Sequence, residues 1–275
     1  MPYHLHITNK NYSSWSLRPW LLLRQLNIPF TEEYHPLISG TFRQPQWHAF
    51  SPVAHVPCLH VLPNNPLSSS TTTTTSPSAT TPPNGPGNDG EEEPLILWDS
   101  LAITEHLAEA HRDKPVYPSA PAARAWARSA VAEMHAGFPA VRRTLGFNVG
   151  VRVALADSVF EEGEDGGEEL ARELKRVDEL WREGLERFGG PFLGGKEFTA
   201  VDAFFAPVVL RVQTYVGVGE RLSGRARGYV ERMLEVEGVR EWVGAALRET
   251  GREVVHERES VEGEGKRLVA DLRAT

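Results

Sequence analysis

The chain has 275 residues, a hydrophobic content of 40% and a formal net charge of −8. This length suits two domains, and the acidic balance argues against nucleic-acid or anionic-membrane partners, which require a basic face. The single cysteine, Cys58, excludes an intrachain disulfide and a cysteine-rich metal site, while the polar N-terminus and the lack of a long apolar run predict a cytoplasmic protein without a membrane span.

The N-terminal residues predict a strand, a helix and a second strand. An apolar run favours a strand over 3–8, followed by a helix over 14–26. A strand over 30–34 is parallel to the first if the helix is a crossover. Ser13 and Ser14 lie where the helix begins, and the free N–H groups and dipole of a helix N-terminus suit an anion such as a thiolate. The same serines can also serve only as helix caps.

The next segment predicts a hairpin that carries an insertion. Residues 56–62 are strand-like but include Pro57, which cannot donate to a strand ladder. A cis peptide bond between Val56 and Pro57 is one solution. Residues 63–94 consist mainly of Ser, Thr, Pro and Gly, which predicts a disordered insertion. A strand signal resumes over 95–98, so the two strands are expected to pair in antiparallel fashion around the insertion.

Asp99 and Ser100 can cap a helix predicted over 101–112, which ends a first domain over residues 1–112. Three prolines within 113–121 indicate a linker.

The second domain, over 122–250, is predicted to be all-helical and to begin with one long helix over 122–145. Thr199 and Asp202 form a capping box for a helix that is apolar almost all round, which predicts the buried centre of this domain. Residues 251–275 are expected to form a charged tail, frayed or loosely helical.

Four motifs in this order resemble the cytosolic glutathione transferases. They are SSWSLR at 13–18, HVPCL at 55–59, DS at 99–100 and FLGGKEFTAVDAFFAPV at 192–208. The first is similar to the Ser-Ser-Cys-Ser-x-Arg stretch of the zeta class, whose members include maleylacetoacetate isomerases. The resemblance implies a thioredoxin-like α/β domain followed by an all-helical domain. Three features depart from it: Trp15 replaces the zeta cysteine, and the insertion at 63–94 and an acidic loop expected at 157–169 are foreign to the family.

The resemblance also implies that glutathione is the co-substrate and that a hydroxyl activates its thiol. Ser13 aligns with the first serine of the zeta motif and is the preferred residue, with Ser14 as the close alternative. Tyr12 is a third candidate, because other classes use a tyrosine. Val56, the residue before the cis-proline Pro57, is expected to pair its backbone with the cysteinyl part of glutathione.

The remaining contacts are expected at the two ends of glutathione. Asp99 would bind the γ-glutamyl ammonium, and Ser100 with the helix N-terminus would bind the carboxylate, although both residues can equally be simple caps. His55 would face the glycine carboxylate or be a surface histidine. Cys58 is expected to be a buried structural thiol, and the lack of a cysteine at 13–16 disfavours thiol-transferase chemistry. No metal is expected at this site.

The sequence therefore predicts a glutathione transferase that acts on a small electrophile, with zeta-type cis–trans isomerisation as the specific candidate and a homodimer implied by the resemblance. Arg18 either reaches the substrate or packs within its motif, whereas Arg142 and Arg143 favour helix-surface charges over substrate contacts. The alternatives are a non-catalytic binding or assembly module of the same fold and a carrier of apolar ligands.

Overall fold

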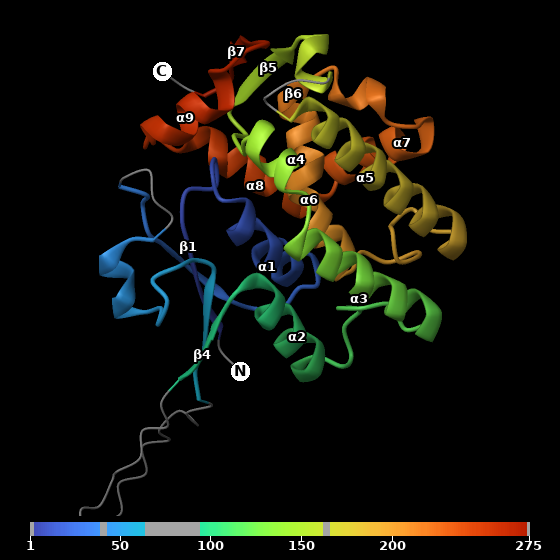
Figure 1. Ribbon diagram of the computed structural model, residues 1–275. Helices are drawn as coiled ribbons and strands as arrows, with labels where there is room; N and C mark the ends of the chain where they lie inside the picture. The colour runs from blue at the N-terminus through green and yellow to red at the C-terminus, as the bar shows by residue number, and fades with distance from the viewer. Residues whose placement is uncertain (1–2, 39–42, 64–93, 162–165, 274–275) are drawn as a thin grey trace, which may run out of the picture.

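The computed structural model describes residues 3–38, 43–63, 94–161 and 166–273. An α/β part built from the N-terminal third of the chain packs beside a larger, mainly helical part (Figure 1). Apart from its first and last residues, the insertion predicted at 63–94 lies outside the described residues. Within them, no helix is both long and apolar enough to cross a membrane.

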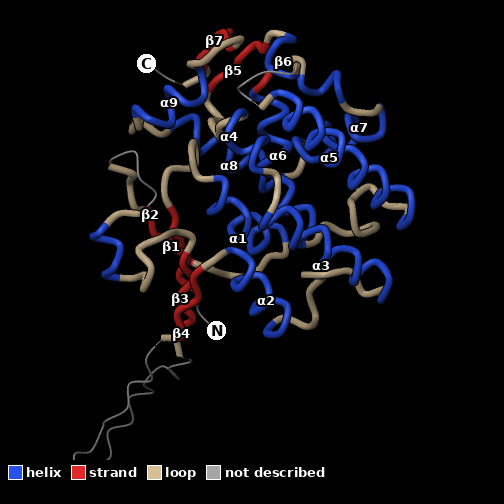
Figure 2. The backbone as a smooth tube through the Cα atoms, viewed as in Figure 1, coloured by secondary structure: helices blue, strands red, loops and turns tan. Residues whose placement is uncertain are grey.

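A four-stranded sheet with the order β2-β1-β3-β4 forms the α/β part (Figure 2). β2 runs parallel to β1, as expected for a crossover through α1, and β3 is antiparallel to both β1 and β4. The predicted strands, helices and hairpin are therefore confirmed. The elements are β1 (Tyr3–Ile7), α1 (Ser14–Gln25), β2 (Thr31–Tyr34), the 3-10 helix η1 (Pro45–Ala49), β3 (Cys58–Val61), β4 (Leu95–Trp98) and α2 (Ser100–Ala110).

The two faces of this sheet differ in chemistry. Leu5 and Ile7 of β1 are fully buried and pack in the main core with residues of α1 and α2. Because side chains alternate along a strand, His6 points to the opposite face, where its ring stacks on Phe50 at a centroid distance of 4.4 Å. One face thus supports the two helices, and the other carries polar groups under the segment around η1.

The predicted cis peptide bond is present between Val56 and Pro57, directly before β3. Cys58 follows it and is fully buried, as expected for a structural thiol. Its thiol donates to the Phe50 carbonyl at 3.5 Å, and burial raises the pKa of the Cys58 thiol to about 12. Cys58 is therefore a protonated thiol at neutral pH.

The C-terminal part is mainly helical, but two details differ from the predictions. The single helix expected over 122–145 is wrong, because Phe138 adopts a left-handed conformation with φ 61° and Pro139 begins a new helix. The loop expected over 157–169 is shorter than predicted, because the 3-10 helix η2 occupies its first residues and α5 its last. The helices are α3 (Pro121–Ala136), α4 (Pro139–Thr144), η2 (Asp157–Phe160), α5 (Gly167–Phe188), α6 (Ala200–Thr214), η3 (Val218–Arg221), α7 (Gly224–Leu234), α8 (Glu237–Arg248) and α9 (Val254–Val261).

A second sheet lies within this part, and the all-helical prediction missed it. Its strands are β5 (Val151–Leu155), β6 (Tyr215–Val216) and β7 (Lys266–Asp271), in the order β6-β5-β7. The tail expected over 251–275 as frayed or loosely helical does form a helix, α9, but it continues into β7, which was not predicted and which pairs antiparallel with β5. A strand that depends on a partner over a hundred residues away is not visible in its local sequence pattern.

α6 is the buried centre of the C-terminal part, as predicted. Thr199 and Asp202 form the expected capping box at its start. The fully buried Asp202 carboxylate accepts hydrogen bonds from the Thr199 N–H and the Leu193 N–H, both at 3.0 Å, and from the Tyr229 hydroxyl at 3.1 Å. The Asp202 carboxylate therefore holds together the start of α6, the loop before it and α7.

Replacing Thr199 by Ala is expected to lower the free energy of unfolding by about 1 kcal/mol, the usual cost of losing a capping hydroxyl. Equilibrium urea unfolding measures this change, and Thr199→Ser is the matched control because it keeps the hydroxyl. Equal destabilisation by the two variants would contradict the capping role.

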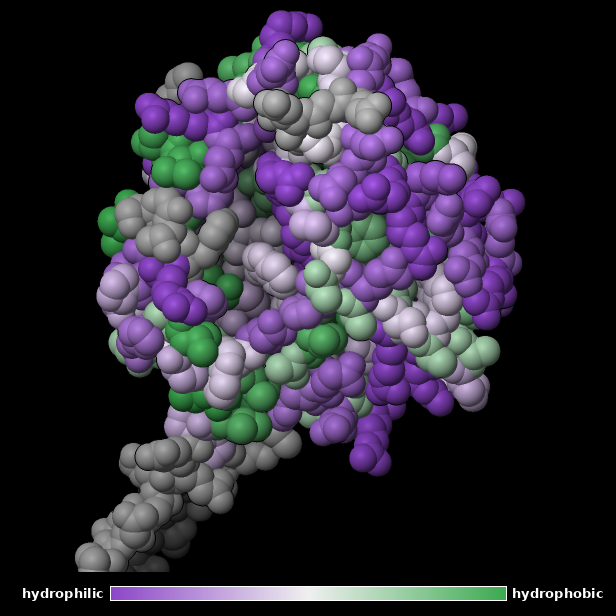
Figure 3. Space-filling view, viewed as in Figure 1, coloured by the Kyte–Doolittle hydropathy of each residue, from purple (hydrophilic) through white to green (hydrophobic). Residues whose placement is uncertain are grey.

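The face shown in Figure 3 is mainly hydrophilic over the helical part. Hydrophobic side chains gather near β4, where Leu95 and Trp98 are 52% and 45% exposed. β4 is one of the two edge strands of its sheet, with only β3 beside it.

Candidate functional site

Ser13 and Ser14 lie at the N-terminus of α1, as the motif predicted. Ser13 is the N-cap: its hydroxyl accepts from the Ser16 N–H at 3.2 Å and donates to the Ser16 hydroxyl at 2.7 Å. Ser14 is the first helical residue, and no hydrogen bond to its hydroxyl is found within the part of the chain that the structure describes. Both serines are buried, at 3% and 7% exposure. The Ser14 hydroxyl is thus the one left free to donate.

Asp99 and Ser100 lie at the N-terminus of α2. Asp99 is the N-cap, with a positive φ of 86°, and its Oδ1 accepts from the Leu101 N–H at 2.7 Å. Its Oδ2 lies 3.4 Å from Nε2 of His135 on α3. Burial lowers the pKa of His135, although Asp99 opposes this. Asp99 thus lies between the two parts of the chain, with a mainly neutral imidazole beside it at pH 7.

Arg18 joins the starts of the two helices. This arginine of α1 is 1% exposed, and its Nη1 donates to the Ser100 hydroxyl at 3.4 Å. Its guanidinium stacks 4.2 Å from the ring centroid of Trp15 and 4.7 Å from that of Phe204. Its Nε is buried and has no hydrogen-bond partner in the described part of the chain. Arg18 thus brings together the two predicted serine motifs and leaves one donor unpaired.

A second arginine lies against the same tryptophan. The guanidinium of Arg142 is 4.9 Å from the Trp15 ring centroid and donates to the carbonyls of Met134, His135 and Gly137. The interpretation of Arg142 as a helix-surface charge is therefore wrong, because the side chain is tied to the end of α3. Burial lowers the pKa values of Arg18 and Arg142. The region around Trp15 therefore contains two desolvated guanidinium groups.

Arg143 behaves as its surface interpretation predicts. Its side chain is 57% exposed, and its Nη2 lies 3.5 Å from Oε2 of Glu169. It takes no part in the cluster around Trp15.

Val56 and His55 lie on the approach to β3. Val56 is half-buried and precedes Pro57 across the cis bond. His55 is exposed, and its Nε2 accepts from Nε of Arg43 at 3.2 Å. Burial, and then the nearby Arg43, lower the pKa of His55, so His55 is neutral at pH 7 and can offer a hydrogen bond but no positive charge.

Tyr12 is unsuited to the role of thiol-activating hydroxyl. Its hydroxyl donates to Oε1 of Glu257 and accepts from Nη1 of Arg273 at 3.2 Å. Burial, followed by the hydrogen bond to Glu257, raises its pKa well above the usual value. The Tyr12 hydroxyl proton is therefore engaged in a hydrogen bond to the Glu257 carboxylate of α9.

The loop between β1 and α1 is fixed by the C-terminal part of the chain. The Glu249 carboxylate accepts from the N–H groups of Lys10 and Asn11, at 2.7 and 3.2 Å, and Nε1 of Trp242 donates to the Lys10 carbonyl at 3.0 Å. Asn11 in turn accepts from the Gly150 N–H at 2.8 Å. Sequence patterns gave no signal for these partners, because each lies more than a hundred residues away.

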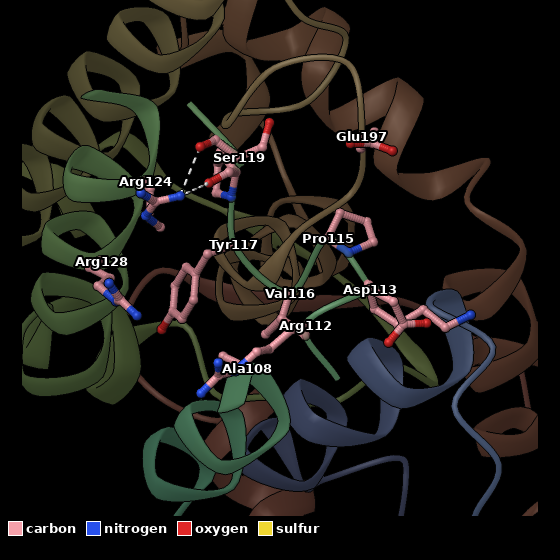
Figure 4. A pocket seen from close by; sticks show the side chains of 12 residues that line it. Ala108, Arg112, Asp113, Pro115, Val116, Tyr117, Ser119, Arg124, Arg128 and Glu197 are labelled. Carbon is pink, nitrogen blue, oxygen red and sulfur yellow. Dashed lines mark hydrogen bonds between the residues drawn. The ribbon is translucent and has the colours of Figure 1, made fainter. Parts of the chain in front are cut away.

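A pocket at the opposite end of α2 is a separate feature. It lies at the C-terminal end of α2 and along the linker to α3, whereas Ser100 begins the helix. Figure 4 shows Arg124 donating to the carbonyls of Pro118 and Ser119 at its rim, at 3.4 and 2.8 Å. None of the predicted site residues lines this pocket.

Two family models match the chain. Residues 12–110 match the model described as Glutathione S-transferase, N-terminal domain, and residues 164–245 match the model described as Glutathione S-transferase, C-terminal domain. No curated protein matches the sequence.

Solved structures of this fold resemble the whole chain. A tau class glutathione S-transferase from mango, Mangifera indica, is 15% identical, with a TM-score of 0.58 over 94% of this chain and 95% of that chain. A glutathione transferase homolog from a Burkholderia strain, solved with bound glutathione, is 17% identical, with a TM-score of 0.54 over 89% and 97%. Glutathione transferase Omega 2S from Trametes versicolor is 18% identical, with a TM-score of 0.56 over 94% and 96%.

Together the comparisons confirm the predicted fold class, a thioredoxin-like domain followed by a helical domain. The similar structures include tau and omega members, so they support the family rather than the zeta class in particular.

Proposed function

The chain belongs to the glutathione S-transferase family, and we propose on that premise that it binds glutathione at the N-termini of α1 and α2 and activates the thiol with a serine. The observation that carries this proposal is the contact between Arg18 and Ser100 at 3.4 Å. It supports the proposal because it links α1, which begins at the Ser13–Ser14 pair, to the start of α2, where the Asp99–Ser100 pair lies.

The serine is proposed to stabilise the thiolate of bound glutathione. A free thiol has a pKa of about 8.5 and is mostly protonated at pH 7. Lowering that pKa by about two units requires roughly 2.7 kcal/mol. One hydrogen bond to a charged group contributes about 1.5–3 kcal/mol and a helix N-terminus about 0.3–1 kcal/mol. A hydroxyl at the start of α1 is therefore sufficient, and no metal or general base is needed.

Ser13 and Ser14 remain the two candidates for this hydroxyl. The motif favours Ser13, but in the structure its proton is directed to Ser16. Ser14 needs no rearrangement in order to donate. The thiolate can also draw the Ser13 proton away from Ser16, since a charged acceptor is the stronger one. Single substitutions separate these possibilities.

The other groups are proposed to hold the ends of glutathione. The carboxylate of Asp99 suits the γ-glutamyl ammonium, and Ser100 with the N-terminus of α2 suits the adjacent carboxylate. The backbone of Val56 would pair with the cysteinyl part, and the neutral imidazole of His55 would donate to the glycine carboxylate.

The electrophile is proposed to be a small acidic molecule, with maleylacetoacetate-type compounds as the specific case. The buried Arg18 and the half-buried Arg142 supply positive charge beside the site, and the Arg18 Nε has no hydrogen-bond partner within the described residues. In an isomerisation, the thiolate adds to the conjugated cis double bond, the resulting single bond rotates, and elimination of the thiolate leaves the trans product. Turnover of maleylacetone by the purified protein tests this activity.

Asp99→Asn is expected to weaken glutathione binding by about tenfold, because the ammonium loses one charged partner. Asn is an equally good N-cap and tolerates a positive φ, so this substitution removes the charge with little effect on α2. Isothermal titration calorimetry measures the affinity, and the thermal midpoint checks the fold. Unchanged affinity would remove Asp99 from the proposed site.

The alternative, a non-catalytic module of the same fold, makes a different prediction. Such a module has no need to ionise the thiol, so any bound glutathione would keep the thiol pKa of free glutathione. Dimerisation, which the family resemblance implies, is a separate proposal that analytical ultracentrifugation tests.

A further inference from the structure

Three ligand-type side chains converge on the sheet face that the helices leave open. His6 lies on β1 and Glu33 on β2, and the two residues are paired in the parallel register. Paired residues direct their side chains to the same face, and His35, two residues after Glu33, extends the same row. Leu5 and Ile7, the neighbours of His6 along β1, pack in the main core with α1, so the His6 side chain lies on the face of the sheet away from that helix.

The distances between the ligand atoms suit a metal ion. Nδ1 of His6 lies 2.9 Å from Nε2 of His35 and 3.5 Å from Oε2 of Glu33, and Nε2 of His35 lies 3.7 Å from Oε1 of Glu33. An ion held at 2.0–2.2 Å by nitrogen and oxygen ligands separates neighbouring ligand atoms by roughly 2.9–3.5 Å, from octahedral to tetrahedral geometry. Small side-chain adjustments therefore bring all three atoms into one coordination shell.

The chemical state of these groups also suits a metal. Burial, and then the nearby histidines, lower the pKa of His6 to about 3, and burial lowers that of His35 despite the opposing Glu33. Both imidazoles are therefore neutral at pH 7, the form that ligates metals. Within the described residues, Glu33 has no lysine or arginine partner, so its charge is available.

Nδ1 of His6 is already hydrogen-bonded to Nε2 of His35 at 2.9 Å, and an ion held by the cluster would replace that contact. The His6 side chain is 6% exposed, and its buried Nε2 has no hydrogen-bond partner among the residues that the structure describes. The neighbouring His60 does not supply one, because its Nε2 pairs with the Phe50 carbonyl at 2.7 Å. Nδ1 is therefore the nitrogen of His6 that faces His35 and Glu33.

The cluster is open on one side. A pocket of about 390 Å³ borders Glu33 and His35 and is also lined by Pro36, Gln46 and Phe50. Side-chain exposures of 57% for Glu33 and 19% for His35 give an ion a path from solvent. Three protein ligands and an open side are the arrangement of a site that keeps a coordination position for water or an added ligand.

We propose that His6, Glu33 and His35 form a binding site for a divalent transition-metal ion such as Zn²⁺, separate from the glutathione site. Two imidazoles and one carboxylate are ligands that Zn²⁺ and Co²⁺ accept. Cys58 is paired with His6 across β1 and β3, but its Sγ donates to the Phe50 carbonyl at 3.5 Å and does not belong to the group of ligand atoms that lie within 4.8 Å of one another. The site therefore has nitrogen and oxygen ligands only.

The test is a titration of the untagged protein, free of glutathione, with Co²⁺ and then Zn²⁺. One equivalent of Co²⁺ is expected to bind saturably, with visible d–d absorption and no thiolate-to-cobalt charge-transfer band, and Zn²⁺ is expected to displace it. His35→Gln and Glu33→Gln are each expected to weaken binding by at least about tenfold. His48→Gln is the matched control, since this exposed histidine of η1 lies outside the cluster.

Absence of saturable one-to-one binding by the wild type would overturn the proposal, as would wild-type affinity in His35→Gln or a thiolate band. Glu33→Gln keeps the test decisive if His35→Gln fails to fold, because Glu33 is largely exposed and its replacement leaves the buried histidines in place.

Discussion

A Ser13→Ala, Ser14→Ala double variant is expected to lose roughly 10- to 100-fold in kcat/KM for glutathione conjugation at neutral pH. The loss corresponds to the roughly 1.5–3 kcal/mol of one hydrogen bond to the thiolate. The N-terminus of α1 and its dipole remain, so some ionisation of the thiol persists. The effect should shrink at high pH, where glutathione ionises without help from the protein.

The single variants identify which serine acts. Ser13→Ala removes the cap of α1 and is expected to cost about 1 kcal/mol of stability, whereas Ser14→Ala leaves the Ser13–Ser16 hydrogen bonds intact. Loss of activity in Ser14→Ala at wild-type stability would assign the role to Ser14. Ser129→Ala, at an exposed position of α3, is the control for replacing a serine by alanine outside the proposed site. Wild-type kcat/KM in the double variant would contradict the serine mechanism.

Arg273→Met is expected to lower the free energy of unfolding by about 3 kcal/mol, the largest stability effect anticipated here. Arg273 is 5% exposed, and its guanidinium donates to both oxygens of Glu257, to Asp271 and to the Tyr12 hydroxyl. Removing the buried Arg273 leaves the half-buried Glu257 carboxylate without its cation, whereas the exposed Asp271 can be hydrated instead. Urea unfolding measures the loss, and Arg267→Met, at an exposed position of β7, is the matched control.

The loss of unfolding free energy caused by Arg273→Met is also expected to depend on pH. Hydrogen bonds from Arg273 lower the pKa of Asp271, and those from Arg273 and Tyr12 lower the pKa of Glu257 although burial opposes this. Both carboxyls therefore contribute stability above their unfolded pKa values of about 4, and that contribution is lost as the pH falls through the lower folded values. The difference between wild type and Arg273→Met should be full at pH 7 and shrink below about pH 4. A difference that does not change with pH would show that packing, not charge, dominates.

Local chemistry explains why much of the fold and of the candidate site was predictable. Pro57 within a strand pattern restricts the backbone, and Asp99–Ser100 and Thr199–Asp202 are polar pairs placed directly before apolar helices. Each of these signals involves residues within a few positions of one another. The structure has the cis bond and caps at these places.

The features that were missed depend on partners distant in the sequence. β7 is a strand because β5 lies beside it, and Arg273 is buried because Tyr12 and Glu257 surround it. The position of Arg142 against Trp15 depends on how the two domains pack. Likewise, His6, Glu33 and His35 meet only through the strand register, which spacing alone does not reveal.

The most direct test of the central claim is the pH titration of bound glutathione, followed by the ultraviolet absorbance of its thiolate. The account predicts that wild-type protein binds glutathione and lowers the thiol pKa by about two units from the free value of about 8.5, and that the double serine variant binds it with little shift. Bound glutathione with an unshifted thiol in the wild type, or no binding at all, would contradict the account.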